Sequence, residues 1–342
     1  MHINFFLYYF IFGIIFIFLT RKMNLFIDYK IEKHKKYVSS SKSYFLGGLL
    51  LLPYFYYYFG LIKNEYLLLT FLSLIFLIGF LSDTKILNSV SIRFFLQVIF
   101  ILIFVQSINL EIKSTKIIFI DNFLSNPYFN SFFVTFCLMI LTNGGNFIDG
   151  LNGLLLKYYI TLGLVILLSF DFLNFQDLIF FKYLLLILVV LLLLNLTGII
   201  YMGDSGAYLL SFFMGYFLIN LYSDNLFISP YIIIVFFWYP CFELLFSMIR
   251  RRLKNDKTYM PDTKHLHQLL HDFIKNKFRL NNEKLSHIYT SIIINFYNLI
   301  IFLISVNFIY YSEICVLILI INIIVYLLTY RSLYLKVKKI KF

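Results

Sequence analysis

The sequence predicts an all-α polytopic membrane protein. Of its 342 residues, 61% are hydrophobic and only 13% are charged, a balance that soluble domains do not show. Continuous apolar runs long enough to cross a bilayer recur from one end of the chain to the other. A transmembrane β-barrel would instead show short segments in which apolar and polar residues alternate. The apolar runs are therefore expected to form helices.

About eleven transmembrane helices are expected from these runs and the polar stretches between them. Together they form one integral membrane domain over residues 1–342, in which residues 248–285 are the largest loop. The first run has no basic segment before it and no small-residue cleavage site after it, which favours an uncleaved helix. The expected spans are, in order, 3–20, 44–62, 66–81, 91–109, 128–142, 154–170, 178–195, 206–222, 228–247, 286–309 and 312–330.

The basic residues are distributed unequally between the two sides of this arrangement. When the loops are assigned alternately to two compartments, 25 of the 29 Lys and Arg residues fall on the side that also holds the C-terminus. The positive-inside rule then places the N-terminus outside, and the C-terminus and the 248–285 loop in the cytoplasm. Loops that face anionic lipid head groups explain the net charge of +12, so binding of nucleic acid is not expected.

One polar stretch, residues 142–154, interrupts the apolar sequence at the end of the short fifth span. Asn143, Asn146, Asp149 and Asn152 recur at every third position, with glycines between them. So many glycines predict that the helix ends here and opens into a tight polar loop. A simple turn could use such side chains to satisfy backbone groups. This stretch holds more of them than one turn needs, so a binding site is favoured.

Carboxylates also lie near the ends of three other predicted spans. Asp83 follows the third span, where it could simply be a solvated charge at the membrane boundary. Asp204 lies in a Met-Gly-Asp-Ser-Gly sequence before the eighth span, where it could be an N-cap or a ligand for a hard cation such as Mg²⁺. Glu243, late in the ninth span, has no obvious partner in the sequence.

The 248–285 loop carries an arginine run, 250–252, and a pair of histidines. The arginine run is typical of a membrane boundary. His265 and His267 have the spacing of a metal pair, but a zinc site would need further ligands, so binding of phosphate is the better interpretation. Acidic turns for a divalent cation and basic groups for phosphate, all facing one compartment, suggest phosphoryl transfer at the membrane surface.

Five segments resemble, in order, the motifs of the polyprenyl-phosphate N-acetylhexosamine-1-phosphate transferases of glycosyltransferase family 4. This family includes the enzyme that starts O-antigen synthesis and the translocase that makes lipid I of peptidoglycan. Eleven spans fit the O-antigen branch better than the peptidoglycan branch. The five segments are Asp28 with Lys33-His34-Lys35 and Gly47-Gly48, Gly79–Arg93, Asn143–Leu154, Met202–Gly206 and Pro261–Gln268.

The resemblance implies a specific reaction. A polyprenyl phosphate, such as undecaprenyl phosphate, would attack the β-phosphate of a UDP-N-acetylamino sugar and release UMP, with Mg²⁺ or Mn²⁺ as cofactor. It implies catalytic roles for Asp83, Asp149 and Asp204, and the metal would be held by Asp204 with Asp83. The residues expected to bind substrate are Lys33, His34, Lys85, Arg93, Asn143, Asn146, Asn152, His265 and His267.

Three positions depart from the family pattern. Ser82 stands where the family has the first Asp of a pair, Asn152 where it has a second Asp, and Gln268 where it has a third His. Ser and Asn can still ligate a cation or form hydrogen bonds. The loss of two carboxylates nevertheless leaves an inactive lipid-binding homologue as one alternative. A membrane transporter is the other, although its substrate site would be expected near the midplane of the membrane.

The expected location is the bacterial inner membrane, with the active site on the cytoplasmic face. The expected pathway is the start of a cell-surface glycan such as the O-antigen of lipopolysaccharide. The partners would then be the polyprenyl phosphate, the UDP-sugar and the membrane itself, with no nucleic acid. The sequence leaves open the identity of the sugar and the assembly state, for which a homodimer is one alternative.

Overall fold

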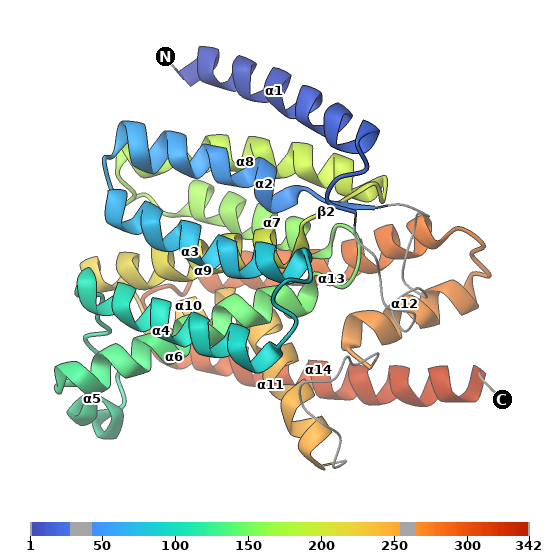
Figure 1. Ribbon diagram of the computed structural model, residues 1–342. Helices are drawn as coiled ribbons and strands as arrows, with labels where there is room; N and C mark the ends of the chain where they lie inside the picture. The colour runs from blue at the N-terminus through green and yellow to red at the C-terminus, as the bar shows by residue number, and fades with distance from the viewer. Residues whose placement is uncertain (1, 28–42, 254–263, 341–342) are drawn as a thin grey trace.

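A computed structural model describes residues 2–27, 43–253 and 264–340 of the chain (Figure 1). Apart from one pair of two-residue strands, the regular structure in these ranges is helical, as the sequence predicts. The elements are, in order, α1 (His2–Lys22), β1 (Tyr44–Phe45), α2 (Gly47–Phe55), the π-helix η2 (Tyr56–Ile62), α3 (Tyr66–Asp83), α4 (Val90–Ser107), α5 (Ile118–Leu124), α6 (Pro127–Ile148), α7 (Leu154–Ser169), α8 (Phe175–Leu196), β2 (Ile200–Tyr201), α9 (Gly203–Asp224), α10 (Pro230–Phe236), α11 (Trp238–Leu253), α12 (Leu266–Lys277), α13 (Glu283–Val306) and α14 (Ser312–Ile340).

Each of the eleven expected spans contains helix, but the helices are not equally suited to cross a bilayer. Among the described residues, eight helices are long and apolar enough to do so. The pair α10 and α11 adds a ninth candidate if the two helices are counted as one bent span. α7, and α2 together with η2, are apolar but shorter. The multi-pass class is therefore confirmed, and the count of eleven stays a prediction.

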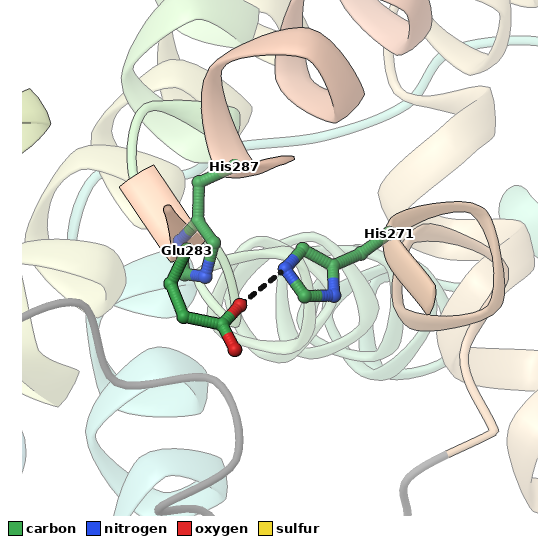
Figure 2. Close-up of side chains that lie close together, drawn as sticks. All are labelled: His271, Glu283 and His287. Carbon is green, nitrogen blue, oxygen red and sulfur yellow. Dashed lines mark ion pairs between the residues drawn. The ribbon is translucent and has the colours of Figure 1, made fainter. Parts of the chain in front are cut away.

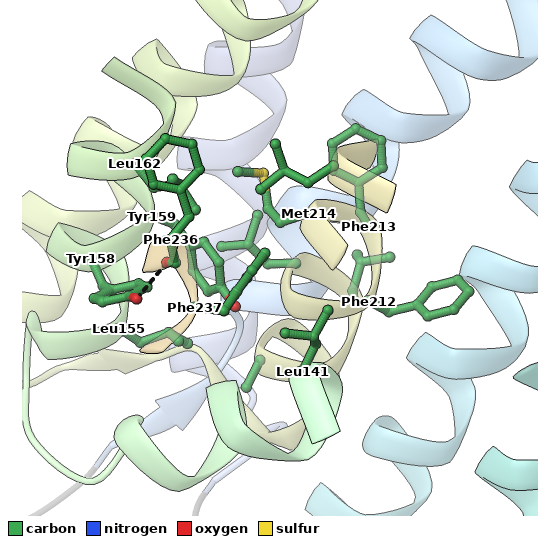
Figure 3. Packing of buried hydrophobic residues seen from close by; sticks show 14 of the residues in the cluster. Leu141, Leu155, Tyr158, Tyr159, Leu162, Phe212, Phe213, Met214, Phe236 and Phe237 are labelled. Carbon is green, nitrogen blue, oxygen red and sulfur yellow. Dashed lines mark hydrogen bonds between the residues drawn. The ribbon is translucent and has the colours of Figure 1, made fainter. Parts of the chain in front are cut away.

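The buried centre of the helical bundle is α9. It packs against α2, α3 and α6, and every residue from Ser205 to Gly215 is buried. Figure 3 shows Phe212, Phe213 and Met214 of α9 within the packed apolar cluster. In Figure 1, α1 lies at one edge of the bundle, next to α8 and α2. The first turn of α9 is therefore held by neighbours on several sides.

The two short strands bring the start of α2 to the start of α9. β1 and β2 pair in parallel, although they are far apart in the sequence. A Cβ atom on Gly48 of α2 would lie only 2.6 Å from the backbone nitrogen of Gly206 in α9. No side chain fits between backbones at that distance, so position 48 requires glycine.

A bend replaces the straight helix that the ninth apolar run would suggest. α10 and α11 meet at an angle of 73°. Pro240 has no N–H with which to donate to the carbonyl of Phe236 four residues earlier, so the helix loses that hydrogen bond. The Tyr158 hydroxyl of α7 donates to this carbonyl instead, at 2.6 Å (Figure 3). The bend thus results from a proline and is stabilised by a tyrosine from another helix.

The prediction that the fifth span ends before the Asn- and Gly-rich stretch was wrong. α6 continues through this stretch as far as Ile148. The glycines permit close packing: a Cβ atom would lie 2.9 Å from the Pro240 carbonyl if added to Gly144, and 1.9 Å from the Ser211 hydroxyl oxygen if added to Gly145. Tertiary contacts with α11 and α9 therefore outweigh the low helix propensity of glycine.

We expect Tyr158→Phe to lower the free energy of unfolding by about 1–3 kcal/mol, because the variant removes the donor to the buried Phe236 carbonyl. Tyr128→Phe is the matched control, since its side chain is 82% exposed, and should change stability by less than about 0.5 kcal/mol. Denaturant or thermal unfolding of the purified protein in detergent measures both. Equal stability of the two variants would show that this hydrogen bond does not stabilise the bend.

Candidate active site

Asp83, the last residue of α3, lies against the N-terminus of α9. Its Oδ1 accepts a hydrogen bond from the backbone N–H of Asp204 at 2.8 Å. Its Oδ2 accepts from the backbone N–H of Ser205 at 3.0 Å and from the Ser205 hydroxyl at 2.7 Å. The first N–H groups of a helix have no acceptor within the helix and carry partial positive charge. Asp83 is thus more than a solvated boundary charge, because it caps α9 from another helix.

Asp204 lies in the first turn of α9 and is not its N-cap. Its Oδ2 accepts hydrogen bonds from Ser82 Oγ at 2.6 Å and from Arg93 Nη1 at 2.7 Å. Its Oδ1 accepts from Asn146 Nδ2 at 2.8 Å. These donors come from α3, α4 and α6, so one carboxylate joins four helices. We call Ser82, Asp83, Arg93, Asn146 and Asp204 the Asp204 cluster.

Two glycines allow the Asp83 carboxylate to reach α9. Gly79 lies one turn before Asp83 on the same face of α3, and a Cβ atom there would lie 2.5 Å from the Cα of Ser205. Gly203 has a φ of +70°, in the left-handed region that favours glycine. A Cβ atom on Gly203 would also lie 2.6 Å from Asp83 Oδ2. The capping contact therefore depends on the absence of a side chain at both positions.

Both asparagines of α6 that were predicted to bind substrate face neighbouring helices of the site. Asn143 donates through Nδ2 to Gln97 Oε1 on α4 at 3.0 Å. One turn further along α6, Asn146 faces Asp204, and one turn back along α4 from Gln97 lies Arg93. The structure therefore brings Asn143, Asn146 and Arg93 together along one seam between α6 and α4.

The predicted histidine pair lies at the start of α12, against the C-terminal end of α6. His265 Nδ1 lies 2.9 Å from Glu243 Oε1, and its ring is parallel to that of His267 with 5.3 Å between the centroids. The ring of Phe147 packs edge-on against His265 at 5.5 Å. The histidines therefore contact the last turn of α6, the helix that also carries Asn146.

The turn between α6 and α7 is fixed from two sides. The backbone N–H of Asn152 donates to His287 Nδ1 of α13 at 3.1 Å. The next N–H, of Gly153, donates to Asn195 Oδ1 of α8 at 2.5 Å. Asp149 follows the last residue of α6, with its side chain half-buried. Its expected role as a catalytic carboxylate stays a prediction.

The segment that contains the Asp204 cluster, residues 66–222, matches the family model described as glycosyl transferase family 4. The match confirms the resemblance noted in the sequence, and it runs from the first turn of α3 to the last turns of α9. This similarity supports, in general terms, transfer of a sugar phosphate to a polyprenyl phosphate. No curated protein matches the chain.

The family is generally dependent on a divalent metal, and the Asp204 cluster suits one. Two carboxylates lie in the cluster, and only that of Asp204 contacts the Arg93 guanidinium. An ionised carboxylate has about four acceptor positions. Hydrogen bonds among the described residues use three at Asp83 and three at Asp204, so each Oδ1 can still bind a cation. Phosphate and water oxygens would complete the coordination of Mg²⁺ or Mn²⁺.

Three other residues were predicted to bind substrate, and one of them, Lys85, lies in the described part of the chain. Lys85 is exposed in the turn between α3 and α4, where its φ of +61° lies in the left-handed region. Lys33 and His34 lie outside the described residues. The roles expected for these three residues stay predictions.

Several contacts of the site were not predicted from the sequence. Glu243, which seemed to lack a partner, is buried and accepts hydrogen bonds from His265 and from the hydroxyl of Tyr326 at 2.8 Å. Gln97 and His287 hold parts of the Asn-rich stretch. A buried carboxylate within an apolar run was the one signal that could have indicated a hidden partner.

We expect Gly79→Ala to slow sugar-phosphate transfer by about 100-fold or more. The added methyl group would meet the backbone of Ser205 and displace Asp83 from α9, and a displacement of about 1 Å can have an effect of this size. Gly13→Ala on α1 is the control, because its Cβ would make ordinary contact at 3.8 Å. Initial rates of the two variants measure the effect. Normal activity of Gly79→Ala would contradict the close approach of α3 to α9.

Proposed function

We propose that the protein transfers an N-acetylamino-sugar 1-phosphate from a UDP-sugar to a polyprenyl phosphate such as undecaprenyl phosphate. The products would be the polyprenyl-diphospho-sugar and UMP. The observation that carries this proposal is the Asp204 cluster, in which carboxylates, a guanidinium, an amide and a hydroxyl from four helices meet. Phosphoryl transfer depends mainly on positioning and on stabilising charge, and these groups can do both.

In the proposed reaction, an oxygen of the lipid phosphate attacks the β-phosphorus of the UDP-sugar. The bond from that phosphorus to the oxygen bridging it to the α-phosphate breaks, and UMP leaves with this oxygen. A phosphate monoester loses its second proton near pH 6, so the attacking group is already largely ionised at neutral pH. A strong general base is then unnecessary. This fits Asp83, whose oxygens are engaged by α9.

The residues in and around the cluster would bind the metal ion, the phosphates and the nucleotide sugar. Bound Mg²⁺ or Mn²⁺ would neutralise charge on the diphosphate, and Asp204 with Asp83 would hold it. Arg93 lies beside the Asp204 carboxylate and would donate to a phosphate oxygen. The asparagines and Asp149 on one side, and His265 with His267 on the other, would bind the nucleotide sugar and its phosphates.

We place this reaction on the cytoplasmic face of the bacterial inner membrane. The end of α3, the start of α4, the end of α6 and the start of α9 contact one another. In the alternating assignment these four ends belong to the side that holds most Lys and Arg residues. The step would start a cell-surface glycan such as the O-antigen of lipopolysaccharide. A transporter is less well supported, because these polar groups meet at helix ends and not near the midplane.

The first test is release of UMP. We expect purified protein with Mg²⁺, polyprenyl phosphate and a panel of UDP-amino sugars to release UMP and form a lipid-linked sugar diphosphate with at least one donor. Nucleotide chromatography and mass spectrometry of the lipid product would identify that donor. If folded protein releases no UMP with any donor, the proposed transferase activity is contradicted and the alternative of an inactive lipid-binding homologue is favoured.

A charge-neutral variant of α9 provides the control for this experiment. Asp204→Asn keeps the size of the side chain but loses the charge that faces Arg93 and the metal. We expect it to lower turnover by about 100-fold or more and to weaken the dependence on Mg²⁺ concentration. Asp224→Asn, exposed at the opposite end of the same helix, should remain fully active. Equal rates for the two variants would exclude Asp204 from the chemistry.

The orientation can be tested independently of activity. In a background that lacks the half-buried Cys137 and Cys241, Lys85→Cys should react with an impermeant thiol reagent only from the cytoplasmic side. Lys113→Cys, in the loop between α4 and α5, should react only from outside. Both side chains are exposed, so access to the reagent depends on the side of the membrane. The opposite pattern would overturn the proposed topology.

A further inference from the structure

A second group of polar side chains joins α12 to α13 (Figure 2). His271 projects from α12 towards Glu283 and His287, which lie one turn apart in the first turns of α13. One donor atom from each of the three residues lies within 4.8 Å of the other two. Both histidines are buried. Lys275 contacts Glu283 Oε1, while Glu283 Oε2 faces His271.

The ring of His271 lies between two carboxylates. Asp272 Oδ1 lies 3.4 Å from its Nδ1, and Glu283 Oε2 lies 3.3 Å from its Nε2. Ionised carboxylates only accept hydrogen bonds, whereas a neutral imidazole has a single N–H to donate. If Nδ1 donates the single N–H of a neutral ring to Asp272, the lone pair of Nε2 faces Glu283 Oε2, and a cation between these two atoms would join them. A carboxylate beside Nδ1 is also the usual partner of a histidine that ligates a metal through Nε2.

The donor atoms select the class of cation. Two imidazoles and one carboxylate are typical ligands of Zn²⁺ and related transition metals, whereas Mg²⁺ takes oxygen ligands. Ligands at about 2.0–2.2 Å from a tetrahedral ion are about 3.3–3.5 Å apart. The 3.3 Å between His271 and Glu283 already matches this separation. A modest inward movement of His287 would complete three ligands and leave a fourth position for water.

We propose that His271, Glu283 and His287 form a binding site for a zinc-type transition-metal ion that fastens α12 to α13. The site is separate from the oxygen-donor site at the Asp204 cluster, since it is built from different helices. It does not depend on the proposed transferase activity.

The ion would compete with the backbone of Asn152 for His287. His287 Nδ1 accepts the Asn152 N–H, which places the proton of a neutral ring on Nε2. A metal on Nε2 requires the other tautomer, whose Nδ1–H can no longer accept that hydrogen bond. One hydrogen bond between neutral groups contributes much less than three metal–ligand bonds. Metal binding is therefore expected to prevail and to loosen the turn between α6 and α7.

Cobalt titration tests the site directly. Tag-free, chelator-treated protein in detergent is titrated with Co²⁺ in a large excess of Mg²⁺, which occupies sites built from oxygen ligands. We expect one equivalent of Co²⁺ per chain, the visible absorption of a tetrahedral complex, and displacement by Zn²⁺. Added Zn²⁺ should also raise the melting temperature, because the ion binds the folded state. Folded wild-type protein that gives no such absorption would overturn the proposal.

Matched variants locate the binding. Glu283→Gln and His271→Asn should lose the stoichiometric Co²⁺ absorption and the Zn²⁺-dependent rise in melting temperature. Glu313→Gln, an exposed glutamate in the first turn of α14, should retain both, as should Asp204→Asn. Glu283 is partly exposed, so its isosteric variant is expected to fold. Unchanged absorption in folded Glu283→Gln would overturn the assignment, because Co²⁺ would then bind without Glu283.

Discussion

The rest of the site depends on the Asp83 carboxylate at the N-terminus of α9. This contact ties the end of α3 to the start of α9, where Gly79 and Gly203 let the two chains approach. Asp83 accepts hydrogen bonds from backbone N–H groups in the first turn of α9 and from the Ser205 hydroxyl. The Asp204 side chain is therefore not needed for capping and can face Arg93. Asp83 therefore has a structural role, and the Asp204 carboxylate remains available to bind a cation.

Residues 66–222, which match the family model, also depend on contacts with helices that follow them in the chain. The Asn-rich stretch within this segment is supported by α12, through the contact of His265 with Phe147, and by α13, through the hydrogen bond from Asn152 to His287. Both helices follow residues 66–222, the part that matches the family. The C-terminal helices are therefore part of the site architecture, and changes in their packing will reach the turn between α6 and α7.

The sequence predicted which polar residues meet better than it predicted how they meet. Asp83, Arg93, Asn146 and Asp204 were all recognised, because charged and amide groups are rare in apolar runs. That Asp83 caps α9 depends on a contact between residues more than 120 positions apart, which local patterns do not encode. The glycines of α6 suggested a break because glycine has a low helix propensity. The residues that they pack against belong to other helices, and local sequence does not reveal such contacts. Glu243 was noticed, but its partners lie on α12 and α14.

α6 is continuous across two different environments. Near its N-terminus, Phe132 and Phe136 are exposed on the outer surface, whereas Thr142 and the turns that follow are largely enclosed by other helices. A helix of this length behaves as a stiff rod, and a bilayer thicker or thinner than its apolar surface tends to tilt such a rod. Tilting its lipid-facing end would move Asn146 relative to Asp204. We therefore expect the geometry of the site to respond to the thickness of the surrounding membrane.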